Sequence, residues 1–281
     1  MRTTIVTSIA KKEIMDNVRN KWIILISVMF ALLTLVISYF GSLRSPGWQD
    51  LGVTIAGMEN LITFLVPIIA LMLGYAAIIG EIERGSMSSL LSMSTTRFEI
   101  IIGKFLGLAS VLCFMILVGF GTAGLVIAVN VSNVNYLDYL VFLGATMLLG
   151  LVFLTITMFL STIFNKRSAA MGGAILLWFL FNIILPVVFL GLLATSVDIT
   201  TIGPSSTIIA PDWYNIIQFF NPTAVYSSLI TIAIGPVSSM DFSSIIPLPS
   251  WYSSWLLVSV LLAWIILFFS LAVWRFQKKD I

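Results

Sequence analysis

Long apolar runs separated by short polar segments dominate the chain. Six of these runs are long enough to cross the roughly 30 Å hydrocarbon core of a bilayer as a helix, which rises about 1.5 Å per residue. They cover residues 22–40, 61–80, 105–129, 139–164, 169–195 and 255–274. The pattern predicts an all-α polytopic membrane protein in which residues 1–281 form a single transmembrane domain with six spanning helices.

A different period occurs in residues 1–21, ahead of the first run. Apolar side chains recur there at four-residue spacing in Val6, Ala10, Ile14 and Val18, and charged residues lie away from this stripe. One apolar stripe on an otherwise polar helix is typical of a helix that lies flat on a membrane surface. We therefore expect an N-terminal amphipathic interfacial helix.

Basic residues are distributed unevenly between the two sides that six spans define. The N-terminus, residues 81–104, residues 165–168 and the C-terminus share one side, which holds thirteen of the fourteen Lys and Arg residues. The other side holds only Arg44. Because cytoplasmic loops are enriched in Lys and Arg, this asymmetry predicts that both termini are cytoplasmic and that the chain is a multi-pass plasma-membrane protein.

Two connecting segments are long, residues 81–104 on the cytoplasmic side and residues 196–254 on the outer side. The outer segment contains apolar runs of about 8 to 14 residues separated by prolines, which are too short to span and suit re-entrant helices before the last span. An alternative is a seventh span over residues 215–235. That span would place the basic C-terminus outside, against the charge asymmetry.

Composition excludes several classes of function. The chain is 59% hydrophobic and 9% charged and has no histidine, which removes His-dependent catalytic sites and most imidazole metal centres. Its single cysteine, Cys113, and its scattered methionines form no ligand cluster in the sequence, so we expect no metal site and no catalytic residue. The basic residues form no patch for nucleic acid, and no GxxxxGK[ST] loop is present, so the chain is not itself an ATPase.

The segment GYAAIIGEIERGSMSSLLSMSTTRFEIIIGKFLG, residues 74–107, resembles the first cytoplasmic loop of ABC-2 type transporter permeases. The resemblance lies in the order of an acidic residue, Glu-Arg-Gly, Leu-Leu, a turn, Arg and then Gly-Lys, with Ser94 where the family commonly has proline. It implies that the loop holds a coupling helix that contacts a cytoplasmic ABC ATPase. The implied coupling residues are Glu81, Glu83, Arg84, Gly85, Leu90, Leu91, Arg97, Gly103 and Lys104.

The resemblance extends to the outer segment, where an Asn-Pro element is implied to form part of an outer gate. Its residues are Phe220, Asn221, Pro222 and Tyr226. The most similar subgroup contains permeases linked to maturation of nitrous oxide reductase. The family further implies export, a second permease copy as a homodimer or with a related chain, and ATP and Mg bound by the partner ATPase rather than by this chain.

Other functions stay open at this stage. The main alternative is a non-transporting membrane subunit that transmits ATPase motion to an outer-face protein, as in metalloenzyme maturation. A secondary transporter is less favoured, because no Asp, Glu, Lys or Arg lies in the middle of a predicted span. An intramembrane protease would need histidine or paired acidic residues at membrane depth, and the predicted spans contain neither.

Overall fold

The protein is described from a computed structural model that covers residues 3–18, 21–40, 51–92, 95–130, 136–196, 210–234 and 246–279. All regular elements within these ranges are helices. Their bounds are α1 Thr3–Val18, α2 Lys21–Phe40, α3 Leu51–Gly74, α4 Ile79–Glu83, α5 Ser86–Ser92, α6 Arg97–Asn130 and α7 Tyr136–Ile163. The remaining elements are α8 Arg167–Phe179, the π-helical turn η1 Leu180–Ile184, α9 Leu185–Ser196, α10 Asp212–Ile217, the 3₁₀ turn η3 Gln218–Phe220, α11 Pro222–Ile234 and α13 Ser254–Gln277.

Membrane-length helices form the body of the molecule. Five helical segments in the described ranges are long and apolar enough to cross a bilayer: Gly57–Glu83, Arg97–Val126, Leu137–Ile163, Arg167–Ser196 and Ser254–Gln277. They match the last five predicted spans. The predicted first span coincides with α2. Its part Val28–Phe40 is apolar but shorter than the five membrane-length segments. The all-helical, multi-pass prediction is therefore confirmed.

The outer segment contains a sharply bent pair of helices. Asp212–Phe220 and Pro222–Ile234 meet at 117° around Asn221, so the pair is either one broken span or a re-entrant hairpin. Proline at the first position of α11 fits this break, because a proline N–H is not needed there. The predicted alternative of a seventh span over 215–235 thus corresponds to this bent pair rather than to a straight helix.

Helix α7 lies at the centre of the bundle, where it contacts α3, α6, α11 and α13. Val152, Phe153 and Leu154 on α7 are completely buried. Polar side chains such as Thr146 and Thr157 are also buried there, and their hydroxyl groups donate to carbonyls one turn earlier in the same helix. These internal bonds allow hydroxyl groups to lie in an apolar core.

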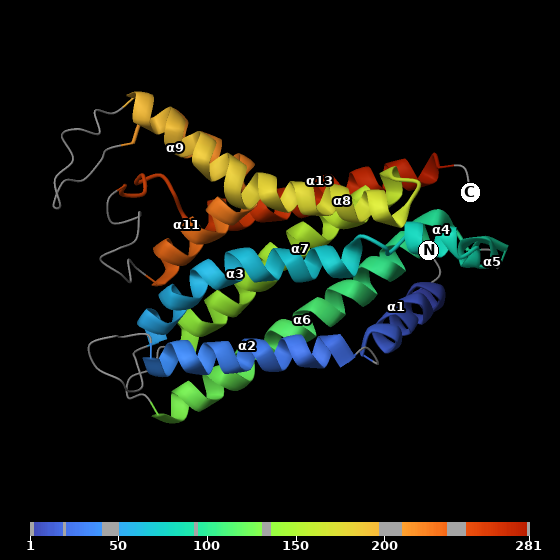
Figure 1. Cartoon of the computed structure of the whole chain (residues 1–281), viewed down its shortest axis with the longest axis horizontal. Helices are drawn as coiled ribbons and strands as arrows, with labels where there is room; N and C mark the ends of the chain where they lie inside the picture. The colour runs from blue at the N-terminus through green and yellow to red at the C-terminus, as the bar shows by residue number, and fades with distance from the viewer. Residues whose placement is uncertain are drawn as a thin grey trace.

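The short helices α4 and α5 lie together at one end of the bundle (Figure 1). The start of α1 and the end of α13 lie at the same end as α4 and α5, whereas α9 and α11 extend to the other end (Figure 1). One difference from the prediction concerns the loop 81–104, because residues Arg97–Lys104 already belong to the long helix α6. The charged residues placed the predicted start of the third span at residue 105, but Lys104 and Arg97 have partners inside the protein, so the helix begins at Arg97.

Candidate coupling site and outer junction

The short pair α4–α5 begins where α3 breaks. The backbone N–H groups of Ile78 and Ile79 both donate to Ser161 Oγ on α7, each at 3.0 Å, which anchors the break to the central helix. After α4, Gly85 adopts φ 73°, a left-handed conformation that other residues rarely take. This conformation turns the chain from α4 into α5.

Helix α5 is attached to the bundle by its apolar side. Met87 is fully buried, and Leu90 and Leu91 pack at the edge of the same cluster. The other buried members of this cluster are Ile9, Ile78, Ile100, Ile101 and Phe276. The opposite side of α5, which includes Ser88 and Ser92, is exposed. The predicted Leu-Leu pair therefore holds α5 in place, and its polar side is available to another molecule.

A group of four charged side chains links α4 to α1 and α6. Lys104 Nζ lies 2.9 Å from Glu81 Oε1 and 2.5 Å from Glu13 Oε1, and Lys12 Nζ lies 3.2 Å from Glu81 Oε1. Lys104 is only 1% exposed and Glu81 only 5%. The two predicted residues Glu81 and Lys104 are thus brought together. Glu13 and Lys12 were not predicted, although both belong to the Lys-Lys-Glu sequence of the N-terminal helix.

Glu83 and Arg84 occupy the exposed end of α4. Glu83 Oε1 accepts a hydrogen bond from the backbone N–H of Arg167 at 2.8 Å, where α8 begins. A carboxylate at this position also complements the helix dipole. Arg84 Nε donates to the carbonyl of Gly80 at 3.0 Å, within its own helix. Both side chains therefore have internal partners and remain accessible to solvent.

Arg97 joins the start of α6 to the end of α13. Its Nη1 donates to the backbone carbonyls of Phe276, Gln277 and Lys279, which are among the carbonyls that lack helical partners at a C-terminus. Lys279 in turn donates to the carbonyls of Thr162 and Phe164 at the end of α7, at 3.0 and 2.6 Å. Burial lowers the pKa of the Lys279 ammonium, and the nearby charge of Arg275 lowers it further.

Gly103, also a predicted coupling residue, faces α1 rather than α5. A Cβ at Gly103 would lie 2.8 Å from the Ile9 Cβ, and a Cβ at Gly107 would lie 2.6 Å from the Glu13 Cβ and 2.8 Å from the Ala10 carbonyl oxygen. The Gly103–Gly107 spacing thus marks the place where α1 approaches α6 most closely. Ser94, the one departure from the family pattern, lies outside the described residues.

The predicted Asn-Pro element forms a junction with the helix α8–η1–α9. In the π turn, the backbone N–H of Leu185 donates to the carbonyl of Leu180. In a regular α-helix it would donate to the carbonyl of Phe181, which therefore lacks this donor. The next residue, Pro186, has no N–H to replace it. Asn221 Nδ2 fills this vacancy and donates to the Phe181 carbonyl at 2.9 Å. The amide therefore supplies a hydrogen bond that the helix cannot make for itself.

Asn221 also caps the start of α11, since its Oδ1 accepts from the backbone N–H and the hydroxyl of Thr223 at 3.1 and 2.7 Å. Tyr226 is completely buried, with its hydroxyl 3.2 Å from Thr146 Oγ1 on α7. Pro222 is buried and Phe220 is 65% exposed. Three of the four predicted gate residues are thus buried where the bent pair packs on the bundle, and Phe220 projects from it.

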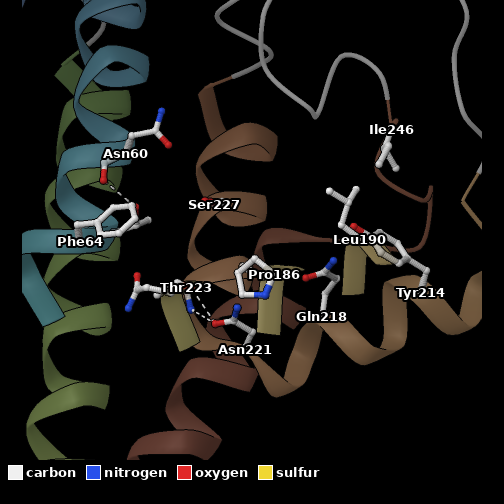
Figure 2. Close-up of a pocket in the computed structure, with 13 residues that line it drawn as sticks. Asn60, Phe64, Pro186, Leu190, Tyr214, Gln218, Asn221, Thr223, Ser227 and Ile246 are labelled. Atoms are coloured by element: carbon white, nitrogen blue, oxygen red, sulfur yellow. Dashed lines mark hydrogen bonds between the residues drawn. The ribbon is translucent and has the colours of Figure 1, made fainter. Parts of the chain in front are cut away.

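A polar pocket of about 320 Å³ opens above this junction (Figure 2). It is lined by Asn60, Thr63, Phe64, Asn182, Pro186, Leu190, Tyr214, Gln218, Asn221, Thr223, Ala224, Ser227 and Ile246. A neighbouring pocket of about 280 Å³ shares several of these residues and reaches Glu59, the one charged side chain among the described residues of either lining. Within the described ranges, no three His, Cys, Asp or Glu side chains come close enough together to hold a metal ion. Among the residues that the structure describes, the pockets offer amide and hydroxyl groups but no cationic group for an anion.

Comparison with known proteins agrees with this architecture. Residues 7–281 match the model of the family described as ABC-2 family transporter protein. The "Probable ABC transporter permease protein NosY" of Stutzerimonas stutzeri is 37% identical over 277 residues, which cover 93% of this chain and 97% of that protein. The protein of the same name from Pseudomonas aeruginosa is 39% identical over 198 residues, covering 68% of this chain and 72% of that protein. The chain therefore belongs to the ABC-2 family of transporter proteins.

Proposed function

We propose that this membrane permease subunit receives motion from a separate cytoplasmic ABC ATPase through α4 and α5, and passes it to the outer junction. ATP and Mg would be bound by the ATPase alone. In the conformational cycle, nucleotide-driven closure of the ATPase would displace α5, and the bundle would alternate between two packed arrangements. Export is the direction that the family resemblance favours.

The observation that supports this proposal is the way the charged residues around α5 are connected. Glu81 pairs with charged groups of α1 and α6, Glu83 binds the start of α8, and Arg97 binds the end of α13. A displacement of α4 would therefore act directly on α1, α6 and α8, and Arg97 at the start of α6 is bonded in turn to the end of α13. A loop that served only to connect two spans would not need these contacts.

The orientation is part of the proposal. With α2 and the five long helices as spans and the bent pair as an outer re-entrant hairpin, both ends of the chain lie on the side that carries thirteen of the fourteen basic residues. That side is the cytoplasm, so the exposed face of α5 would meet the ATPase. The polar pockets would then open towards the outer side.

A second copy of the permease, or a related chain, would complete the transporter. Few residues of α8 and α9 are buried, and large apolar side chains such as Leu176, Val187 and Leu190 are exposed on them. Lipid or another permease can cover such a surface, because both are apolar. We propose that part of it lies against the partner permease.

A non-transporting role is the second candidate function. The residues that line the two pockets argue against transport of metal ions by this chain. Among the described residues, the pocket linings contain neither methionine nor cysteine, and the sequence contains no histidine. Soft metal ions prefer those ligands. If the system serves metalloenzyme maturation, as in the subgroup that the sequence resembles, this chain would transmit force to an outer-face protein and not bind the metal itself.

The proposal is tested by changing the exposed part of the coupling site. Glu83→Ala with Arg84→Ala should lower co-purification with the cognate ATPase by roughly tenfold, as expected for the loss of about 1–2 kcal/mol of contacts. Membrane insertion should stay normal. Ser88→Trp tests docking alone, because the Ser88 side chain is exposed on the side of α5 that faces away from the bundle.

Gln277→Ala is the matched control, since Gln277 is exposed at the same end of the bundle. It should leave co-purification unchanged. Normal ATPase binding by both the double variant and Ser88→Trp would contradict the proposed coupling surface.

A further inference from the structure

We infer that α1 is a transmission element, which Lys104 joins to α4 as the shared counter-ion of Glu13 and Glu81. The inference rests on the proposed function and extends it to residues that neither the family resemblance nor the relatives' names identify. Glu13, Lys104 and Glu81 are then positioning residues: they set where α1 lies, and none of them needs to touch the ATPase.

The geometry places one lysine between two acids from different helices. Lys104 lies on α6, Glu13 on α1 and Glu81 on α4, with N–O distances of 2.5 and 2.9 Å. The side chains of Lys104, Glu81 and Glu13 are 2%, 6% and 12% exposed. Glu13 and Lys104 are 91 positions apart in the sequence, so their contact joins distant parts of the chain.

Burial decides which contact matters. Lys12 also pairs with Glu81, but its side chain is 50% exposed, and an ion pair open to water contributes little. The Lys104 ammonium is shielded from water, so the two carboxylates are what stabilise its charge. The close approach at Gly103 and Gly107 brings α1 near enough for Glu13 to reach it.

Glu81 has room for a second arrangement. Its Oε1 atom accepts from both lysines, whereas Oε2 is buried without a hydrogen-bond partner among the described residues. A carboxylate with one unused oxygen can rotate and remain paired with Lys104. Rotation of α4 during coupling can therefore keep this ion pair while the weaker contact with Lys12 opens. Lys104 would then pass the displacement to Glu13, and so to α1 and the following helix α2.

The position of α1 can be measured without the ATPase. Ile9 is 7% exposed and packs in the cluster beneath α5, so Ile9→Cys in a Cys113→Ser background should react slowly with N-ethylmaleimide while α1 is docked. Lys104→Met leaves two buried acids facing each other and can fail to fold. The informative variant is Glu13→Gln, Glu81→Gln and Lys104→Met together, which removes every buried charge of the group.

We expect this triple variant to fold and to bind the ATPase, because removal of all partners leaves no charge uncompensated. Labelling of Ile9→Cys should rise by about tenfold, as expected for the loss of a buried ionic contact. Stimulation of ATP hydrolysis by the permease should be lost. Asp16→Asn, which removes an exposed acid from the same helix, is the control and should change neither measurement.

Unchanged labelling in the triple variant would overturn the inference that the ion group holds α1. Faster labelling with normal stimulation would overturn the transmission role. If the unmodified permease binds no ATPase, the proposed function fails together with the transmission role. The labelling experiment would still report the docking of α1, so the two failures can be distinguished.

Discussion

The carbonyl group of Phe181 shows how single residues determine the outer junction. The Leu185 N–H donates to Leu180 instead, and Pro186 has no N–H, so no backbone donor of the helix reaches this carbonyl. The Asn221 side chain donates to it in their place. A buried carbonyl without a partner would cost free energy comparable to a lost hydrogen bond. The amide is therefore required by the defect in the neighbouring helix, and the Asn-Pro pair and Pro186 act as one unit.

Asn221→Ala should lower the free energy of unfolding by about 1–3 kcal/mol, because it removes both the cap of α11 and the nearer of two donors to the Phe181 carbonyl, the other being the Thr223 hydroxyl at 3.4 Å. The loss should be smaller in a Pro186→Ala background, where residue 186 regains an N–H. Denaturant unfolding of the four proteins in detergent measures this coupling. Asn130→Ala is a control, because Asn130 is exposed and bonds only within its own helix. Equal losses in both backgrounds would show that the two residues act independently.

At the same scale, Gly107 limits how closely α1 can approach α6. Gly107→Ala would place a methyl group 2.6 Å from the Glu13 Cβ and 2.8 Å from a backbone oxygen, which cannot move aside easily. We expect a loss of about 1–3 kcal/mol in stability and faster labelling of Ile9→Cys. Gly121→Ala on the same helix meets nothing within 4 Å and should be tolerated. Equal stability of the two variants, measured by thermal unfolding, would argue against close packing at Gly107.

At the scale of elements, apolar length and charge placement were sufficient to predict the helices but not their contacts. The spans, the helix α1 and the turn at Gly85 could be predicted because each depends on local sequence. The pairing of Lys104 with Glu13 could not, since nothing in one sequence shows which distant charges meet. The π turn was missed for a similar reason, because the donor that Asn221 provides to the Phe181 carbonyl comes from a distant part of the sequence.

The element scale also explains why the coupling residues fall into two groups. Glu81 and Lys104 are buried and join helices, whereas Glu83 and Arg84 are exposed at the end of α4. Sequence resemblance alone treats them as one surface. Burial separates the residues that can meet an ATPase from those that can only position the element that meets it.

At the scale of the whole molecule, the proposed orientation determines which end meets the ATPase. The short helices α4 and α5 lie at one end of the bundle and the outer junction lies at the other (Figure 1). The side with thirteen of the fourteen basic residues is expected to be cytoplasmic, because Lys and Arg near span ends are retained there. Motion that begins at α5 must then cross the full bundle, and α7 is placed to carry it, because it contacts α11 at one end and its Ser161 accepts from Ile78 and Ile79 at the other.

Labelling of intact cells with a membrane-impermeant maleimide tests this orientation. In a Cys113→Ser background, Trp213→Cys on α10 should react from outside, because Trp213 is 40% exposed and lies in the outer segment. Ser88→Cys on α5 and Gln277→Cys at the end of α13 should react only after the membrane is permeabilised. The Cys113→Ser protein without an added cysteine sets the background. Reaction of Ser88→Cys in intact cells would place α5 away from any cytoplasmic ATPase. Reaction of Gln277→Cys without reaction of Ser88→Cys would contradict the fold, in which α5 and the end of α13 lie at the same end of the bundle.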